Sequence, residues 1–415
     1  MIMDSDYPLL DDMSSKFGDS FYLLQSDRFS KNYDDFLDLF KSIYPKTNIG
    51  YSYKTNYTPK LCKIILLKGG YAEVVSDMEY DLAVKLGVKT SMIIVNGPYK
   101  SNDLLERYLL GNSIVNIDSY SDYESLKAIS IKFPNKKFEI GVRCNFDIDN
   151  QTISRFGFDV TSDNFNKLIE NINSLPNVTL SGIHCHYPDR DLKSFKVRVD
   201  KILSLAERLF STPPKYIDIG GGFFGKMPLS LSSQFDCQFV TYSEYAKTIA
   251  TKFRDFFQKY SLDDSPILIL EPGSAIVADT IHFVSRVIDI KEIRGKFFAT
   301  VSGSKFNIGL LTSNINMPMQ VIRSNDSKKQ NNHYHAIDIV GYTCIEGDCL
   351  SRDYEGNIGV KDFVIFSNVG SYSLVFKPQF ILPNVPMIEY IDAPGKYEIV
   401  KRQEKSEDVF STYIF

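Results

Sequence analysis

Short apolar runs alternate with amphipathic stretches from about residue 21 to residue 278. The apolar runs have the length of strands, and the stretches between them carry apolar residues at helical spacing. Asp or Ser stands repeatedly just before an amphipathic stretch, where a helix N-cap is expected. The predicted strands are residues 21–26, 48–54, 71–76, 91–97, 113–119, 138–145, 178–186, 215–222 and 267–273.

This alternation predicts a parallel sheet covered by helices. Eight or nine such units over roughly 250 residues fit a closed (β/α)8 barrel as well as an open sheet, and periodicity alone does not separate the two. After residue 278 the pattern changes to strands separated by turns, without a long helical pattern. We predict a barrel over residues 26–278 and an all-β domain, a barrel or sandwich, formed by residues 279–415 and 1–25. Residues 324–332 are predicted to be a solvated loop in this domain.

Composition narrows the class of protein. A length of 415 residues suits two domains, and the 43% hydrophobic and 24% charged fractions are ordinary globular values. The formal net charge of -4 does not favour a nucleic-acid partner. The acidic N-terminus lacks the apolar core of a secretory signal, and no stretch has the ~18 unbroken apolar residues of a membrane span. The six cysteines form no disulfide framework. We therefore expect a cytoplasmic protein without a nucleic-acid or membrane partner.

Lys54 stands at the end of a predicted strand, where active sites of parallel barrels are built. A lysine there can form a Schiff base with a carbonyl cofactor, particularly when its pKa is lowered. Taken alone, a surface lysine in a turn is the more common interpretation.

Gly220, Gly221, Gly222 and Gly225 follow another predicted strand. Glycines let backbone N–H groups approach a phosphate closely. The spacing also matches the GxGxxG fingerprint of dinucleotide-binding folds, but that motif should open a helix at once. No helical pattern follows here, so we favour a phosphate loop over a nicotinamide cofactor site.

His184 and His186 lie two residues apart on one predicted strand and therefore share a face. They could bind a metal ion, make structural hydrogen bonds in a half-buried position, or stack an imidazole on a flat cofactor ring. The sequence offers no third ligand or cysteine pair nearby, so we do not predict a metal site.

Acidic residues and a cysteine complete the candidates. Glu271 ends a very apolar strand, where a carboxylate needs a partner such as a protonated pyridine nitrogen or a structural cation. Cys344 lies beside Glu346 and Asp348 in the second domain. A cysteine can donate a proton and acids beside it can bind a substrate amine, although an isolated cysteine is more often structural.

The order of these signals resembles that of the fold type III pyridoxal-phosphate decarboxylases, the group of diaminopimelate, ornithine and arginine decarboxylases with an alanine-racemase-like barrel. YSYKTN resembles the cofactor-lysine motif of that family. AEVVSDMEYDLA, NGPYKS, SRFGFD, GIHCH, IDIGGGFFG, EPGSAIVA, GYTCIEGD and NVGSY follow in the family's order. The resemblance covers nearly the whole chain. It implies a (β/α)8 barrel that carries pyridoxal 5'-phosphate (PLP), a C-terminal β-domain, and a homodimer with shared active sites that releases CO2 and an amine from an amino acid.

The resemblance also implies roles for single residues. Lys54 would hold PLP as a Schiff base, His186 would stack on the ring, and Glu271 would pair with the pyridine nitrogen. Cys344 of the partner subunit would protonate the carbanion left by CO2. Substrate contacts are expected from Asn316, Glu346 and Asp348. Further cofactor contacts are expected from Glu73, Ser76, Arg155, Gly220, Gly221, Gly222, Gly273, Ser274 and Tyr372, with the three consecutive glycines and the tyrosine at the phosphate.

The chain departs from the family pattern at the expected phosphate site. Ser274 stands where the family usually has a phosphate-binding arginine, and YPDRDLKS follows GIHCH where Gly-Ser is usual. Lys193, Ser194 or backbone groups would then complete this site. Residues 301–322 resemble neither diaminopimelate nor ornithine enzymes, but look more like relatives that act on carrier-linked or conjugated amino acids in siderophore or antibiotic pathways. The alternatives are an amino-acid racemase and a non-catalytic regulatory relative.

Overall fold

The structure is a computed structural model that describes residues 6–149, 153–309, 315–391 and 396–415. The chain divides into two compact units. The barrel unit comprises residues 30–224 and 237–275, and the sheet unit comprises residues 1–29, 225–236 and 276–415. The sequence-based boundaries differ from this division chiefly at residues 225–236, which the sequence placed in the barrel.

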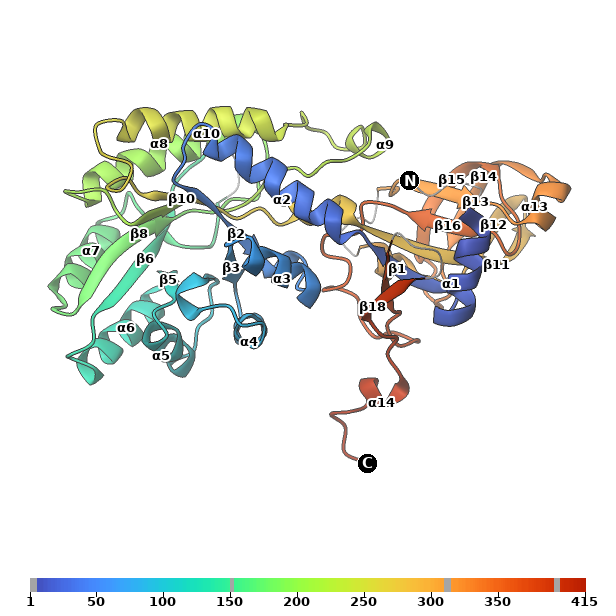
Figure 1. Ribbon diagram of the computed structural model, residues 1–415, viewed down its shortest axis with the longest axis horizontal. Coiled ribbons are helices and arrows are strands. Elements are labelled where there is room, and N and C mark those ends of the chain that lie inside the picture. The colour runs from blue at the N-terminus through green and yellow to red at the C-terminus, as the bar shows by residue number, and fades with distance from the viewer. Residues whose placement is uncertain (1–5, 150–152, 310–314, 392–395) are drawn as a thin grey trace. The chain divides into compact units, whose positions relative to one another are not determined.

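In the described part of the chain, the barrel unit contains a closed ring of parallel strands. Figure 1 shows these strands with helices packed around them. Its strands are β2 Thr47–Ser52, β3 Tyr71–Val74, β4 Ile93–Val95, β5 Ile114–Ile117, β6 Phe138–Asn145, β8 Val178–His184, β9 Tyr216–Asp218 and β10 Ile267–Leu270. The strand order β5-β4-β3-β2-β10-β9-β8-β6 closes because β5 pairs with β6, and the short β7 (Phe158–Asp159) adds to β6. The predicted (β/α)8 barrel is confirmed, and the open sheet is excluded.

Helices accompany the barrel strands. They are α2 Ser26–Lys41, α3 Pro59–Leu67, α4 Asp77–Lys85, α5 Asn102–Leu110, α6 Tyr120–Lys132, α7 Asp163–Ser174, α8 Leu192–Leu209 and α10 Tyr242–Phe257, with the short η2 Tyr53–Thr55 and η3 Thr90–Met92. The short α11 Ser274–Val277 spans the boundary between the units, and η4 Ala278–Thr280 belongs to the sheet unit. A Ser, Asp or Thr side chain caps α4 to α8 and α10 by accepting a backbone N–H from the first turn, as the sequence predicts. Over the described ranges, none of the helices has both the length and the apolar character needed to cross a bilayer.

The sheet unit is built on one mixed sheet. Its strands in the described ranges are β1 Ser20–Leu24, β11 Ile281–Ile293, β12 Lys296–Val301, β13 Met319–Ile322, β14 His333–Val340, β15 Cys349–Asn357, β16 Phe363–Phe366, β17 Met387–Tyr390 and β18 Tyr397–Lys401. β1 pairs with β11 in antiparallel and with β17 in parallel orientation. The N-terminal segment therefore forms an internal strand between segments from the second half of the sequence.

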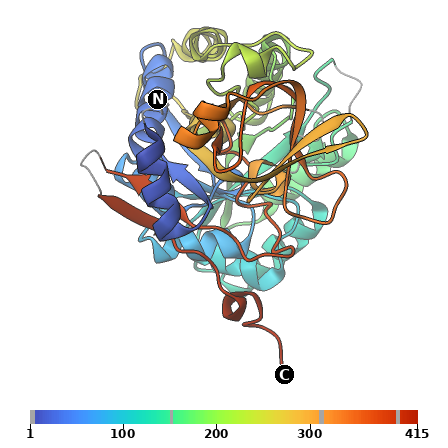
Figure 2. The same ribbon diagram turned by 90° about the vertical axis from the view of Figure 1, so that its right-hand side faces the viewer.

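Short helices complete the sheet unit. α1 (Tyr7–Phe17) lies along the sheet (Figure 2), and its Leu10 and Met13 pack with Phe21 and Ile388 in one core cluster. The others are α9 Leu229–Ser232, α12 Lys305–Ile308, α13 Asn325–Gln330 and α14 Ser406–Val409. The unit is thus mostly sheet rather than purely β.

The predicted loop at residues 324–332 is wrong, because α13 forms there. Ser324 caps this helix by accepting the N–H of Ser327 at 3.1 Å. The Ser327 hydroxyl donates to buried Asp362 at 2.7 Å. A cap and one buried contact therefore organise a segment whose polar composition suggested only solvation.

Two further segments belong to the sheet unit. Residues 225–236 are held there by three hydrogen bonds. The Gln234 side chain donates to the carbonyl of Asn316 at 2.8 Å and accepts the N–H of Asn316 at 2.9 Å, and the Asn368 side chain donates to the carbonyl of Lys226 at 2.9 Å.

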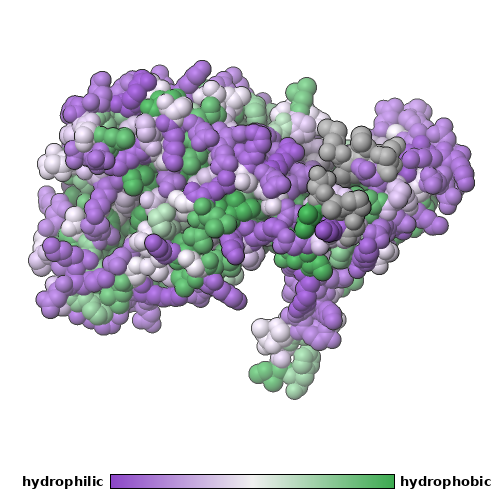
Figure 3. Space-filling model, viewed as in Figure 1, coloured by the Kyte–Doolittle hydropathy of each residue, from purple (hydrophilic) through white to green (hydrophobic). Residues whose placement is uncertain are grey.

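Beyond β18 the chain ends in α14 and an extended segment. Ile414 and Phe415 in this segment are fully exposed, and hydrophobic atoms mark the C-terminal end in Figure 3.

Candidate active site

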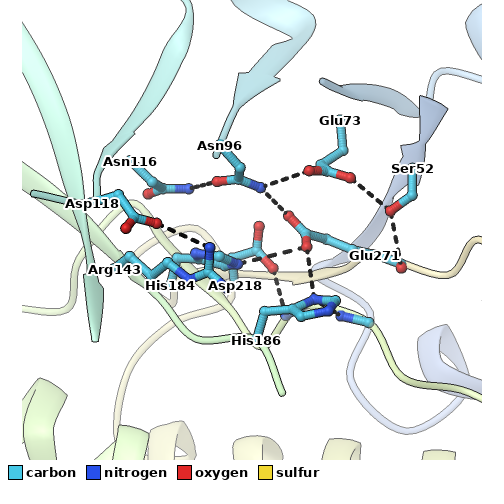
Figure 4. Close-up of polar contacts among 12 residues, drawn as sticks. Ser52, Glu73, Asn96, Asn116, Asp118, Arg143, His184, His186, Asp218 and Glu271 are labelled. Atoms are coloured by element: carbon cyan, nitrogen blue, oxygen red, sulfur yellow. Dashed lines mark hydrogen bonds and ion pairs between the residues drawn. The ribbon is translucent and has the colours of Figure 1, made fainter. Parts of the chain in front are cut away.

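The carboxyl ends of the barrel strands carry a connected set of polar side chains (Figure 4). These ends of parallel strands meet at one mouth of a barrel. The side chains that contribute, in chain order, are Ser52, Lys54, Glu73, Asn96, Asn116, His184, His186, Asp218 and Glu271. Each lies at or just beyond the end of a strand whose other residues are mostly apolar.

Lys54 lies in η2, directly after β2. Its Nζ forms an ion pair with Glu73 Oε2 and lies 3.4 Å from Ser52 Oγ. The Lys54 side chain is 29% exposed, whereas Glu73 is buried. The amine is therefore held by a buried carboxylate and remains accessible at the barrel mouth.

An amide joins the two buried carboxylates of this network. Asn96 Nδ2 donates to Glu73 Oε1 at 3.1 Å and to Glu271 Oε1 at 2.6 Å. Asn116 Nδ2 donates to Asn96 Oδ1 at 2.8 Å, which fixes the orientation of the Asn96 amide. Glu271 is thereby positioned through side chains from two neighbouring strands.

Glu271 is surrounded by basic groups. Burial opposes its ionisation, but His184 and Lys54 hold the pKa of Glu271 well below its ordinary value. Its Oε2 lies 3.6 Å from His184 Nε2 and 3.5 Å from His186 Nδ1. Glu271 therefore stays a carboxylate and can face a protonated ring nitrogen.

Asp218 is the second acid in this environment. Burial and the negative charge of Glu271 raise the pKa of Asp218 well above its ordinary value. Its Oδ1 accepts the N–H of Gly220 at 2.8 Å, and its Oδ2 has no hydrogen-bond partner among the described residues. Two neighbouring buried carboxyl groups avoid double ionisation, so Glu271 carries the charge and Asp218 the proton.

His186 is a neutral imidazole. Its Nδ1 accepts the N–H of Gly221 at 2.9 Å, and burial lowers the pKa of His186 to about 4. His184, His186 and Glu271 each offer an atom within 4.8 Å of the others, a spacing that a metal ion could use. The bond from Gly221 occupies the His186 lone pair that faces Glu271, which disfavours the metal interpretation.

Gly220, Gly221 and Gly222 form a turn after β9, called the glycine turn below, that packs tightly against His186. Gly220 and Gly222 have φ of +68° and +94°, where other residues are strained. A Cβ at Gly220 would lie 2.5 Å from the carbonyl oxygen of Cys185 and 2.8 Å from His186. At the end of β10, a Cβ on Gly273 would lie 2.1 Å from Thr55 Oγ1. Both glycine positions therefore allow backbone segments to converge beside Lys54 and His186.

Three predicted cofactor residues lie outside this network, and two of them make other contacts. Ser76 caps α4 by accepting the N–H of Glu79 at 3.3 Å. Arg155 is exposed, with its guanidinium 4.1 Å from the ring centroid of Phe156. Ser274 is half-buried and begins α11.

The remaining predicted site residues belong to the sheet unit. Cys344 and Glu346 are exposed in the turn between β14 and β15. Asp348 is 2% exposed and accepts hydrogen bonds from Ser304, Thr343 and the N–H of Lys305. Its carboxylate therefore holds this loop together.

Asn316 and Tyr372 are also in the sheet unit. The Asn316 side chain accepts the N–H of Arg352 at 3.1 Å and donates to its carbonyl at 3.3 Å. Tyr372 has φ of +57°, and its ring centroid lies 5.8 Å from that of Phe376.

Sequence reasoning missed Ser52, Asn96, Asn116 and Asp218. One signal could have found them, because each is a polar residue at the carboxyl end of an apolar strand. Their roles in orienting Glu73 and Glu271 depend on contacts between strands that are distant in the sequence.

Residues 31–278 match the family described as pyridoxal-dependent decarboxylase, pyridoxal binding domain, which is more than half of the 415-residue chain. The chain belongs to this family. The enzyme is a PLP-dependent amino-acid decarboxylase. The barrel mouth fits this cofactor, because it combines an accessible lysine, an ionised carboxylate, a neutral imidazole and a glycine turn.

Curated relatives resemble the chain over most of its length. The diaminopimelate decarboxylase of Archaeoglobus fulgidus is 25% identical, covering 90% of this chain and 88% of the relative. The L-glutamyl-[BtrI acyl-carrier protein] decarboxylase of Niallia circulans is 25% identical, covering 99% and 97%. The 2-[(L-alanin-3-ylcarbamoyl)methyl]-2-hydroxybutanedioate decarboxylase of Staphylococcus aureus is 26% identical, covering 78% and 82%.

The fold is shared with solved structures. The diaminopimelate decarboxylase of Methanocaldococcus jannaschii superimposes with a TM-score of 0.84 at 21% identity, covering 97% of this chain and 94% of that chain. This likeness supports a barrel with an additional, mostly sheet domain.

Proposed function

We propose that Lys54 carries the covalent link to PLP and that the enzyme decarboxylates a conjugated amino acid. The observation that carries the proposal is the connected network from the Lys54 amine through Glu73 and Asn96 to Glu271. It joins a nucleophilic amine to a carboxylate that stays ionised, at the end of the barrel where catalytic groups gather.

When bound, PLP supplies an electron sink for the negative charge left on the α-carbon as CO2 departs. Glu271 is placed to hold a proton on the cofactor's ring nitrogen. His186 offers a flat, uncharged surface whose Nδ1 is fixed by Gly221, and Glu73 holds the Lys54 amine beside the site. The glycine turn offers a close backbone approach for the phosphate.

The test of Lys54 is direct mapping of the covalent link. Reduction of the holoenzyme with borohydride, followed by digestion and mass spectrometry, should place the pyridoxyl group on the peptide that contains Lys54. Lys54→Ala should abolish that label and the long-wavelength absorbance of the bound cofactor. Lys63→Ala, which changes an exposed lysine on α3, is the matched control and should keep both signals. A label on another lysine would refute the assignment.

We further propose a homodimer in which Cys344 of the partner subunit protonates the α-carbon, with Glu346 beside it at the substrate amine. Cys344 and Glu346 are exposed on their own chain and therefore available to a neighbouring subunit. The exposed C-terminal residues Ile414 and Phe415 give the sheet unit apolar surface that such a partner could cover.

A mixing experiment tests the shared site. Lys54→Ala and Cys344→Ser homodimers should each be inactive or slow, whereas their random mixture should recover about a quarter of wild-type activity, because half of the dimers carry one intact site. Cys237→Ser changes another exposed cysteine and should have wild-type activity. Absence of recovery in mixed dimers, shown to form by mass spectrometry, would contradict the shared site.

The proposed substrate class rests on residues 301–322 and on the relatives. Two of them are named for amino acids joined to a larger group, a carrier protein in one case and a hydroxydicarboxylate in the other. CO2 release should be compared across diaminopimelate, ornithine, a carrier-linked glutamyl group and a citrate-linked diamino acid. A clear preference for free diaminopimelate would overturn the conjugate proposal.

A further inference from the structure

The barrel unit buries one arginine, Arg198, whose guanidinium donates to carbonyl and hydroxyl oxygens rather than to a carboxylate. Arg198 on α8 is 0% exposed. Its Nη1 donates to the carbonyl of Gly221 at 3.1 Å, its Nη2 donates to the carbonyl of Asp189, and its Nε donates to Ser194 Oγ at 3.0 Å. Across the ranges that the structure describes, Arg198 forms no ion pair with a carboxylate.

Two other buried cations of the same unit show the usual arrangement. Lys100 pairs with Asp122 at 2.9 Å, and Arg143 pairs with Asp118 at 3.0 Å. Removing a cation from water costs several kcal/mol unless an anion compensates for the loss. Burial lowers the pKa of Arg198, but a guanidinium still keeps its charge at neutral pH. Among the described residues, no carboxylate forms an ion pair with this buried charge, and the carboxylates of Asp189 and Asp191 attract it without contacting it.

The environment of Arg198 indicates where a compensating anion binds. Phe195 and Tyr187 flank the guanidinium at 4.3 and 5.4 Å, while the carboxylates of Asp189 and Asp191 belong to half-exposed residues. A Cβ on Gly222 would lie 3.5 Å from Arg198 Nη1 and 2.8 Å from the carbonyl oxygen of Asp189. Three segments therefore converge at one point: the glycine turn, the start of α8 and the loop that follows β8.

The bond to Gly221 also orients the glycine turn. In a trans peptide the C=O and the following N–H point in opposite directions. Because the Gly221 carbonyl points to Arg198, the N–H of Gly222 points to the other side of the turn. The Gly222 N–H can therefore donate to an anion on that side of the turn, and the positive charge of Arg198 behind the turn attracts the same anion.

We infer that Arg198 is a positioning residue for the phosphate of PLP, which orients the glycine turn and supplies the buried positive charge absent at Ser274. This inference rests on the proposed placement of the phosphate at the glycine turn. Of the two side chains suggested from the sequence, Ser194 is buried and acts as an acceptor for Arg198 Nε, whereas Lys193 is exposed.

The test separates binding of the phosphate from binding of the ring. Dissociation constants of PLP and of pyridoxal, which lacks the phosphate, are measured by absorbance titration of the apoenzyme. Arg198→Gln should weaken the binding of PLP by about 10- to 100-fold and that of pyridoxal by less than about threefold, because the glycine turn loses both its charge-assisted bond and the positive charge behind it. Arg198→Lys, which keeps the charge, should recover part of the PLP affinity. Inorganic phosphate should raise the melting temperature of the wild-type apoenzyme and not that of Arg198→Gln.

Arg208→Gln is the matched control. Arg208 lies near the other end of α8 and also donates to a carbonyl, that of Val160 at 2.9 Å, but it is about 15 Å along the helix from Arg198. For Arg208→Gln, the ratio of the dissociation constants of PLP and pyridoxal should match that of the wild-type enzyme. Equal weakening of both ligands by Arg198→Gln or by Arg198→Lys would indicate a purely structural role and overturn the inference. If Lys54 carries the label and the ratio is unchanged, only the Arg198 inference fails. A label elsewhere defeats the proposed function instead.

Discussion

The two ends of the barrel are built from the same strands but differ in chemistry. At the carboxyl ends, Glu73, Asp218 and Glu271 are buried in a network of amides and imidazoles. At the amino ends, a cavity of about 410 Å³ is lined mainly by apolar groups such as Tyr71 and Ile269. Burying charged groups at the carboxyl ends lowers the stability of the fold, whereas packing apolar groups at the amino ends raises it. The difference predicts that activity and stability can be changed separately.

The largest effect is expected from Glu271→Gln at the carboxyl end. The amide keeps the shape of the side chain but loses the charge that faces the ring nitrogen, so kcat should fall by about 100- to 1,000-fold. PLP should still bind, because Lys54 and the glycine turn are unchanged. Steady-state kinetics and cofactor titration measure both quantities.

Glu139→Gln is the matched control at the amino end, where Glu139 lines the cavity. This variant should keep kcat within about twofold of wild type. A wild-type kcat for Glu271→Gln would remove the proposed role of that carboxylate.

The second-largest effect is expected from Ile269→Ala at the amino end. Ile269 is 0% exposed and packs with Tyr71, Ile94 and Tyr216. Its truncation enlarges the existing cavity and should lower the free energy of unfolding by about 2–4 kcal/mol. Denaturant titration of the apoenzyme measures this loss, and the affinity for PLP should stay within about threefold of wild type. A parallel collapse of cofactor affinity would show that the two ends are not separable.

Sequence patterns predicted the barrel because each strand and helix carries its own local signal. The position of Lys54 after β2 and of Glu271 after β10 follows from that pattern. The closure of the barrel does not, because it depends on the pairing of β5 with β6, which periodicity leaves open. The same is true of α13, which forms through the buried contact of Ser327 with Asp362.

The candidate site was less predictable than the fold. Asp348 was expected to contact substrate, yet its carboxylate is occupied by donors from its own loop and from α12. The sequence did not single out Arg198, because an arginine within an amphipathic helix is expected on the face exposed to solvent. Only the packing of α8 against the glycine turn reveals that it is buried without a carboxylate partner in the described ranges.

A smaller effect is expected from pH at the carboxyl end. Burial lowers the pKa of His186 from 6.5 to about 4. Between these values the unfolded chain binds a proton that the folded chain does not. The stability contributed by a neutral His186 is therefore present above pH 6.5 and is lost as the pH falls toward 4. The side chain is 28% exposed, so we expect a loss of about 1–2 kcal/mol rather than the full value for the shift.

The measurement is the difference in unfolding free energy between wild-type and His186→Gln apoenzymes from pH 7 to pH 4.5. Subtracting the variant removes the opposing contribution of Asp218, whose raised pKa favours the folded state at low pH. A difference that does not change with pH would mean that His186 is solvated in the apoenzyme.

The smallest effect is expected at the rim of the amino end. Lys215 Nζ lies 2.5 and 2.7 Å from the two carboxylate oxygens of Glu139, but the side chains are 65% and 52% exposed. Water and salt screen such a pair, and ordering two long side chains costs entropy. A double-mutant cycle with Lys215→Met and Glu139→Gln should therefore give a coupling of less than about 1 kcal/mol that decreases in high salt. A coupling above about 2 kcal/mol would show that charge, and not only apolar packing, stabilises this end of the barrel.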